Sequence, residues 1–155
     1  MASTLELWNK VSVLPAGKWT FTRLLCVKAP YFSSISPLFE ELKPNFCKIS
    51  IKKKRSVLNH IGTVHAIAMC NMAELAGGTM TEVTVPATHR WIPKGMTVEY
   101  LKKAESDLVA IATPVDDHYD WDKAGEYLVN VDVLNQHNEK VFHATITMWI
   151  SKKKK

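Results

Sequence analysis

Residues 64–77 read VHAIAMCNMAELAG, and a second glycine follows at position 78. The stretch is rich in alanine, methionine and leucine, which favour a helix, and the two glycines suit a helix C-terminus. Glu74 is its single charged residue. A helix with one charge in fourteen residues has no polar face to expose to solvent. The sequence therefore predicts a helix that is almost wholly buried at the centre of the fold.

Short helices and strands are predicted on either side of this helix. Upstream, residues 4–14 and 17–30 carry apolar residues at mixed three- and four-residue spacing, which predicts two short helices. Residues 35–51 then predict two strands. The strands predicted downstream span residues 81–92, 96–104, 107–115, 126–134 and 140–150, the last two forming a hairpin. Strands segregated from one central helix exclude a parallel βαβ design and predict an α+β fold, in which a curved antiparallel sheet wraps around the helix.

The composition predicts a single domain over residues 1–155, with an N-terminal helical segment (1–30), a core (31–150) and a basic tail (151–155). Its 46% apolar and 23% charged residues are ordinary for a globular chain. The three cysteines, Cys26, Cys47 and Cys70, are too far apart for a CxxC pair and too few for a disulfide framework. No signal peptide and no membrane-spanning run are recognisable. We expect a cytoplasmic protein without a membrane partner.

The positive charge is local rather than spread over one face. The net charge is +5, and the four lysines at 152–155 supply four of these units. A second run, Lys52-Lys53-Lys54-Arg55, is also short. Duplex binding requires an extended basic surface, so no nucleic-acid partner is expected, whereas a small anionic group such as a phosphate is compatible.

Polar residues that are able to support chemistry gather before and within the central helix. Asn59, Gly62, Thr63 and His65 precede it, and Glu74 lies nine residues after His65. Nine residues at about 100° each place the last two side chains about 180° apart on one helix. They cannot serve one pocket inside one subunit. If both are functional, the site is assembled across a two-fold axis, with Asn59 and His65 from one chain and Glu74 from its partner.

Each of these residues also has a purely structural interpretation. A buried Glu74 is satisfied by a strand backbone or by an ion pair with Arg90 or Lys94. Thr63 caps the helix, while the free N–H groups from Thr63 to Ala66 offer a site for an oxyanion. His65 and Asn59 then serve as packing and turn residues. The six histidines show no HxxxH or HExxH spacing, so neither a metal nor a cofactor is predicted.

The segment NHIGTVHA at 59–66, followed by Glu74 and by RWIPKG at 90–95, resembles hotdog-fold thioesterases of the small PaaI type. The preceding APYFSSISPLFEELKPNFCKI at 29–49 is similar to a less characterised branch of that superfamily, labelled as a domain of unknown function. The resemblance covers about residues 29–150. It implies a curved antiparallel sheet around a long central helix, a homodimer that often doubles to a tetramer, and hydrolysis of acyl-CoA thioesters at the dimer interface.

The resemblance also assigns roles to residues. Asn59 matches an asparagine that positions the thioester or water, His65 a histidine near the thioester carbonyl, and Glu74 the helix carboxylate that activates water or attacks directly. Relatives usually continue His-Gly-Gly, where this chain has His65-Ala66-Ile67. By this resemblance, Ala66 donates its backbone N–H to the thioester oxygen, and the side chain of Ile67 narrows the space around that oxygen. A hydroxyl on the following strand has loose equivalents in Thr81 and Thr84. The substrate-binding residues predicted are Gly62, Thr63, Arg90, Lys94 and Lys102. The three cations either face the phosphates of CoA or are solvated residues of the strands.

The sequence therefore predicts an acyl-CoA thioesterase that releases a carboxylic acid and free CoA. The alternative is a hotdog module that binds acyl-CoA or a fatty acyl ligand without hydrolysing it. A resemblance to hotdog hydratases is disfavoured. Their motif is similar to Asp-x4-His, whereas in this sequence five residues separate Asn59 from His65.

Overall fold

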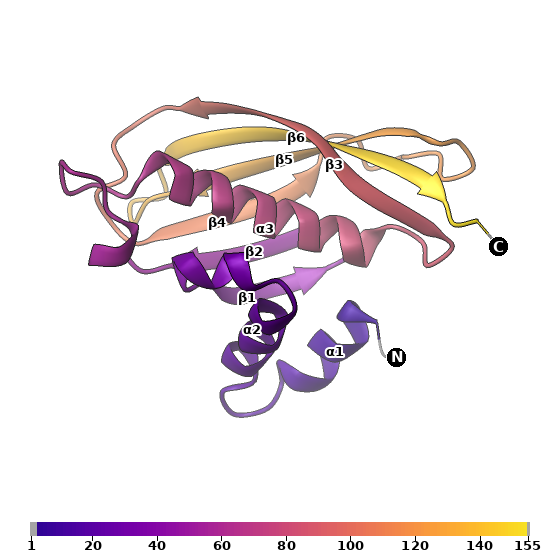
Figure 1. The fold of residues 1–155 in the computed structure, drawn as a ribbon, viewed down its shortest axis with the longest axis horizontal. Helices are drawn as coiled ribbons and strands as arrows, with labels where there is room; N and C mark the ends of the chain where they lie inside the picture. The colour runs from indigo at the N-terminus through magenta and orange to yellow at the C-terminus, as the bar shows by residue number, and fades with distance from the viewer. Residues whose placement is uncertain (1–2, 155) are drawn as a thin grey trace.

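The structure is a computed structural model that describes residues 3–154 (Figure 1). Met1 and Ala2 of the predicted helical segment and Lys155 of the predicted basic tail lie outside the described residues. The helices are α1 (Thr4–Val11), α2 (Gly17–Lys28) and α3 (Ala66–Thr84), with 3-10 turns η1 (Pro30–Ile35) and η2 (Arg55–Val57). The strands are β1 (Leu38–Lys43), β2 (Phe46–Ile51), β3 (His89–Tyr100), β4 (Leu108–Pro114), β5 (Gly125–Leu134) and β6 (Lys140–Lys152).

The six strands form one antiparallel sheet in the order β1-β2-β4-β5-β6-β3, which curves over α3 (Figure 1). Along β4 and β5 buried side chains alternate with partly exposed ones, so one face of the sheet packs inward. The predicted α+β fold is confirmed. Strands β1 and β3 are the two edges.

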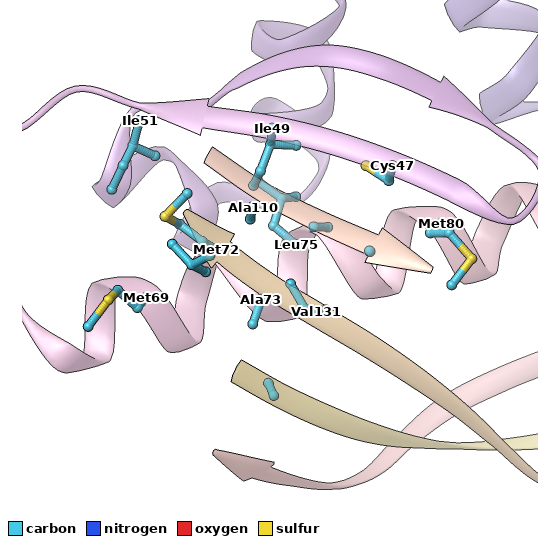
Figure 2. Close-up of a cluster of buried hydrophobic side chains, with 14 of the residues drawn as sticks. Cys47, Ile49, Ile51, Met69, Met72, Ala73, Leu75, Met80, Ala110 and Val131 are labelled. Atoms are coloured by element: carbon cyan, nitrogen blue, oxygen red, sulfur yellow. The ribbon is translucent and has the colours of Figure 1, made fainter. Parts of the chain in front are cut away.

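The core lies between α3 and the inner face of the sheet. Met72, Leu75 and Met80 of α3 are fully buried, and Figure 2 shows them among side chains of the sheet that include Ile49 and Val131. Most residues of α3 are buried, as predicted. Ile67, Glu74 and Glu82 are exposed exceptions on the same helix.

The prediction that the helix ends at Gly77 is wrong, because α3 continues to Thr84. A Cβ atom at Gly77 would lie 2.8 Å from Cδ1 of Ile146, and one at Gly78 would lie 3.2 Å from the ring of Trp91. The two glycines therefore lie where side chains of β6 and β3 pack close to the backbone of α3. Close packing, rather than helix termination, explains them.

The two strands predicted over 81–92 and 96–104 are also corrected. Residues 81–84 belong to α3, and a single strand β3 begins at His89. Its pairing with β6 shifts register between Pro93 and Gly95, so a bulge bends the strand without ending it. Proline is tolerated there because β3 is an edge strand.

The N-terminal helices form as predicted and pack against β1. Ser3 and Glu6 make a reciprocal capping box at the start of α1. Trp8, Phe21 and Phe39 form an aromatic cluster that joins α1, α2 and β1. The backbone N–H of Phe39 also donates to the hydroxyl of buried Thr22 at 3.0 Å. These contacts hold α2 against β1, so that residues at its C-terminal end line the hollow described below.

Candidate active site

The loop before α3 is held together by Asn59. Its amide Nδ2 donates to Thr63 Oγ1 at 2.8 Å, and its Oδ1 accepts from the backbone N–H groups of Ile61 and Thr63. Gly62 has φ +80°, a left-handed conformation that favours glycine. Asn59 thus fixes the loop that leads to His65, and Thr63 is buried inside it.

His65, rather than Thr63, is the N-cap of α3, which corrects the predicted cap. Its Nδ1 accepts from the backbone N–H of Ile67 at 3.0 Å. In the neutral imidazole the proton is then on Nε2, which is left as a donor. Ala66 is the first helical residue, and within residues 3–154 its N–H makes no hydrogen bond. Two donors therefore stand at the positive end of the helix dipole.

Glu74 lies in the wall of a mainly apolar hollow of about 350 Å³. In the single chain its side chain is exposed, so the expectation of a deeply buried carboxylate is wrong. Arg90 donates to Ser151 and Lys94 pairs with Glu126, so neither makes the ion pair considered from the sequence. The hollow is lined by Thr4, Leu25, Lys28, Ala29, Phe32, Glu74, Leu75, Gly78, Thr79, Glu82, Trp91, Pro93 and Met148.

His65 lines a different hollow, of about 360 Å³, together with Tyr31, Ser34 and Asn71. The nine residues between His65 and Glu74 correspond to about 13 Å along α3, at about 1.5 Å per residue. One subunit therefore does not bring Asn59, His65 and Ala66 together with Glu74. The sequence argument that the two halves belong to different pockets of one chain agrees with this geometry.

The hydroxyls expected on the following strand are instead in α3. Thr84 Oγ1 donates to the carbonyl of Met80 at 2.6 Å and accepts from the backbone N–H of Asn45 at 2.8 Å. Buried Thr81 donates to the carbonyl of Gly77. Both hydroxyls are used structurally, and neither lines the hollow of Glu74.

The predicted cations are distributed over several places. Lys102 pairs with Glu139 at 2.7 Å beside the β5–β6 turn, away from the hollow of Glu74. In the second basic run of the sequence, Lys52 pairs with Asp107. Arg90 lines a groove that shares Glu82 and Trp91 with the hollow of Glu74.

Sequence reasoning missed Lys28 and Phe32 as lining residues, and it left Trp91 out of the predicted substrate-binding set although Trp91 also lines the hollow. The indole Nε1 of Trp91 donates to Glu82 at 2.7 Å, and its ring lies over Gly78. Lys28 and Phe32 come from the N-terminal segment and reach the hollow through tertiary packing, for which no local pattern gives a signal. The RWIPKG motif was the one available indication for Trp91.

An uncovered apolar strip follows β3 and the neighbouring side of α3. Ile67 is 56% exposed and Tyr100 is 53% exposed, and Met96 is exposed beside them on the inner side of β3. A hydrogen bond with the Cys70 thiol raises the pKa of the Tyr100 phenol. Because β3 is also a sheet edge, its outward-facing backbone groups have no strand partner within residues 3–154.

Within residues 3–154 no cluster of three or more His, Cys, Asp or Glu side chains has the geometry of a metal site. Among the same residues no helix is long and apolar enough to span a bilayer.

The comparisons with known proteins agree with this architecture. Residues 17–150 match the family model described as Domain of unknown function (DUF4442). A crystal structure of the genomics target APC5556 has 47% sequence identity, covers 97% of this chain and 98% of its own, and has a TM-score of 0.84. The comparison with curated proteins found no match.

Thioesterases appear among the more distant structures. Thioesterase HI1161 from Haemophilus influenzae has 13% identity over 86% of this chain and 90% of its own, with a TM-score of 0.73. The protein PA5026 from Pseudomonas aeruginosa, described as a probable thioesterase, has 20% identity over 84% of this chain and 93% of its own, with a TM-score of 0.74. At such identities the likeness establishes the fold, which is the hotdog fold of these thioesterases.

Proposed function

The chain belongs to the DUF4442 family, and from this premise we propose that it is an acyl-CoA thioesterase whose site is shared across a homodimer interface. The reaction consumes one water molecule and releases a carboxylic acid and free CoA. The observation that carries the proposal is the carboxylate of Glu74 in the wall of an otherwise mainly apolar hollow.

The hollow suits an acyl group. Its volume of about 350 Å³ is within the range of small-molecule sites. Phe32, Leu75, Trp91 and Met148 supply apolar surface. Among residues 3–154, the acids that line the hollow are Glu74 and Glu82. Glu82 is hydrogen-bonded to Trp91, which leaves Glu74 as the carboxylate available to a water molecule or to the thioester carbon.

The start of α3 supplies the complementary half of the chemistry. We assign the free N–H of Ala66 and the Nε2 proton of His65 as donors to the thioester oxygen on which negative charge develops, and the helix dipole adds to their effect. Asn59 positions this pair by holding the loop, in addition to any contact with the substrate. The Ile67 N–H is already used by His65.

A second copy of the chain brings the two halves together. Pairing of β3 with its counterpart would extend the sheet and cover the apolar strip of Ile67, Met96 and Tyr100. Two antiparallel copies of α3 across the two-fold axis then place His65 and Ala66 of one protomer opposite Glu74 of the other. A dimer is the minimal unit, and two dimers forming a tetramer are compatible with it.

The proposed chemistry is balanced with these groups alone. Glu74 takes a proton from water, the oxygen attacks the carbonyl carbon, and the oxyanion is held by Ala66 and His65. The C–S bond then breaks, and the thiolate of CoA takes the proton from Glu74. Direct attack by Glu74, followed by hydrolysis of the resulting anhydride, uses the same arrangement. Of the cations predicted from the sequence, we assign Arg90 to a CoA phosphate, because its groove adjoins the hollow.

The test is steady-state release of free thiol from acyl-CoA esters of increasing chain length, both aliphatic and aromatic. We expect turnover in the native chain and its loss in Glu74→Gln. The matched control is Glu82→Gln, which changes the other carboxylate of the same hollow and should retain turnover. No turnover in the native chain, together with acyl-CoA binding by both the native chain and Glu74→Gln, would instead identify a hotdog binding module.

A further inference from the structure

The N-terminal segment has an unusual charge distribution. From Leu7 to Phe39 the chain contains Lys10, Lys18, Arg23 and Lys28 and no aspartate or glutamate. Surface segments of this length ordinarily mix both signs. The segment therefore carries a net positive charge of its own, separate from that of the lysines at the C-terminus.

The same segment exposes much apolar surface. Six of the fifteen large apolar side chains that are exposed among residues 3–154 belong to it, including Val27 at 81% and Val13 at 79% exposure. We call this set the N-terminal patch: Val13, Leu14, Trp19, Leu24, Val27 and Tyr31. Figure 1 shows α1 and α2 on the far side of β1 from the rest of the sheet, so that the patch lies on a projecting part of the molecule.

Helix α2 carries apolar residues on both its buried and its exposed side. Phe21 and Cys26 are buried against the domain, while Trp19 and Val27 point outward. Trp19, Arg23 and Val27 follow one another at four-residue spacing, so they form a single stripe, in which the guanidinium of Arg23 lies 5.6 Å from the ring centroid of Trp19. The outer side of α2 therefore combines exposed apolar side chains with the cations Lys18, Arg23 and Lys28.

The charge distribution favours a lipid surface over a second copy of the chain. A two-fold contact through the N-terminal patch would bring the four cations of one copy against the same four of the other. An anionic bilayer instead attracts these cations while it accepts the apolar side chains, and tryptophan and tyrosine prefer the headgroup region. Val13 and Leu14, in the turn between α1 and α2, are placed to enter the bilayer first.

We propose that the N-terminal patch docks this protein on the surface of an anionic lipid bilayer. Peripheral docking needs no spanning helix, so it departs from the sequence-based expectation that there is no membrane partner. The patch adjoins the hollow of Glu74, because Leu25, Lys28 and Phe32 of the same segment line that hollow. Docking itself does not depend on thioesterase activity, and the two proposals fail or succeed separately.

The test is sedimentation of the full chain with two kinds of vesicle, one of phosphatidylcholine alone and one of phosphatidylcholine and phosphatidylglycerol in equal parts. We expect binding to the second kind that weakens as salt is raised. The double variant Val13→Asp with Val27→Asp should lower the affinity at least about tenfold, because it places charge on the inserted side chains. Val115→Asp changes an exposed valine outside the patch and should bind like the native chain.

A second pair of variants tests the charge. Lys10→Gln with Lys18→Gln should weaken binding about 25-fold, at about fivefold for each basic residue near the surface. Lys103→Gln with Lys123→Gln removes the same charge elsewhere and should change binding by much less. The proposal is overturned by an absence of binding to the anionic vesicles, or by binding that is unchanged in both patch variants and requires the C-terminal lysines. A patch variant that only dissociates an oligomer, with no effect on vesicle binding, would show that a second copy covers the patch.

Discussion

Replacing Gly77 by alanine tests why two glycines stand in the middle of α3. In an ordinary helix interior, glycine to alanine stabilises by about 1 kcal/mol, because alanine is the better helix former. At Gly77 the new Cβ would lie 2.8 Å from Cδ1 of Ile146 and 3.4 Å from methyl carbons of Val129 and Val131. All three neighbours are fully or almost fully buried, so the side chain of Ile146 has little room to move away.

The two effects have opposite signs, and packing is the larger one. Adding a methyl group to a tightly packed core typically costs about 1–3 kcal/mol. Subtracting the helix gain of about 1 kcal/mol leaves an expected net loss of about 1 kcal/mol for Gly77→Ala. For a chain of this size such a loss lowers Tm by about 2–4 °C.

Urea unfolding followed by circular dichroism measures the difference, with Gly78→Ala as the matched control. Gly78 faces the ring edge of partly exposed Trp91, which is able to tilt, so we expect Gly78→Ala to be neutral or stabilising by up to about 1 kcal/mol. If Gly77→Ala stabilised as much as Gly78→Ala, the packing explanation of Gly77 would be refuted.

Three further changes probe separate features. Thr84→Val should lower the free energy of unfolding in urea by about 1–2 kcal/mol, because both hydrogen bonds of the hydroxyl disappear. It should leave thiol release unchanged, and a large loss of turnover would restore Thr84 to the catalytic site. His65→Asn should keep the helix cap and the stability but, on the proposed function, lower kcat about 10²-fold, whereas His65→Ala should also lose about 1 kcal/mol of stability. Burial raises the pKa of the Asp132 carboxyl, but hydrogen bonds from His143 and Lys140 outweigh burial and hold the pKa below its ordinary value. The ionised carboxylate therefore stabilises the folded chain above about pH 4, and this stabilisation is lost as the pH falls through the lowered pKa. Unfolding free energies at pH 6 and pH 3 should therefore differ less in Asp132→Asn than in the native chain, and an equal difference would contradict the assignment.

The sequence predicted the order of elements well because that information is local. Alternation of buried and exposed residues in β4 and β5, and the apolar composition of α3, need no knowledge of the rest of the chain. The 180° relation between His65 and Glu74 follows from helix geometry alone.

The errors concern features that depend on tertiary contacts. Gly77 resembles a helix end in sequence, and only the nearness of Ile146 shows otherwise. Thr63 and His65 are both able to cap a helix, and the choice depends on the loop that Asn59 closes. Lys28 and Phe32 reach the hollow of Glu74 because α2 docks on β1 through Thr22, which no short-range pattern encodes.

The exposure of Glu74 and Ile67 has a different cause. The sequence of α3 has the composition of a helix covered on every side, yet the single chain leaves Ile67 56% exposed beside the uncovered strand β3. Apolar residues in that position are costly unless another surface covers them. The composition of α3 thus fits its burial in a dimer better than its burial in one chain. This difference supports the proposal that Glu74 acts beside the partner's helix start, because only there does the carboxylate lose the water that surrounds it in the monomer.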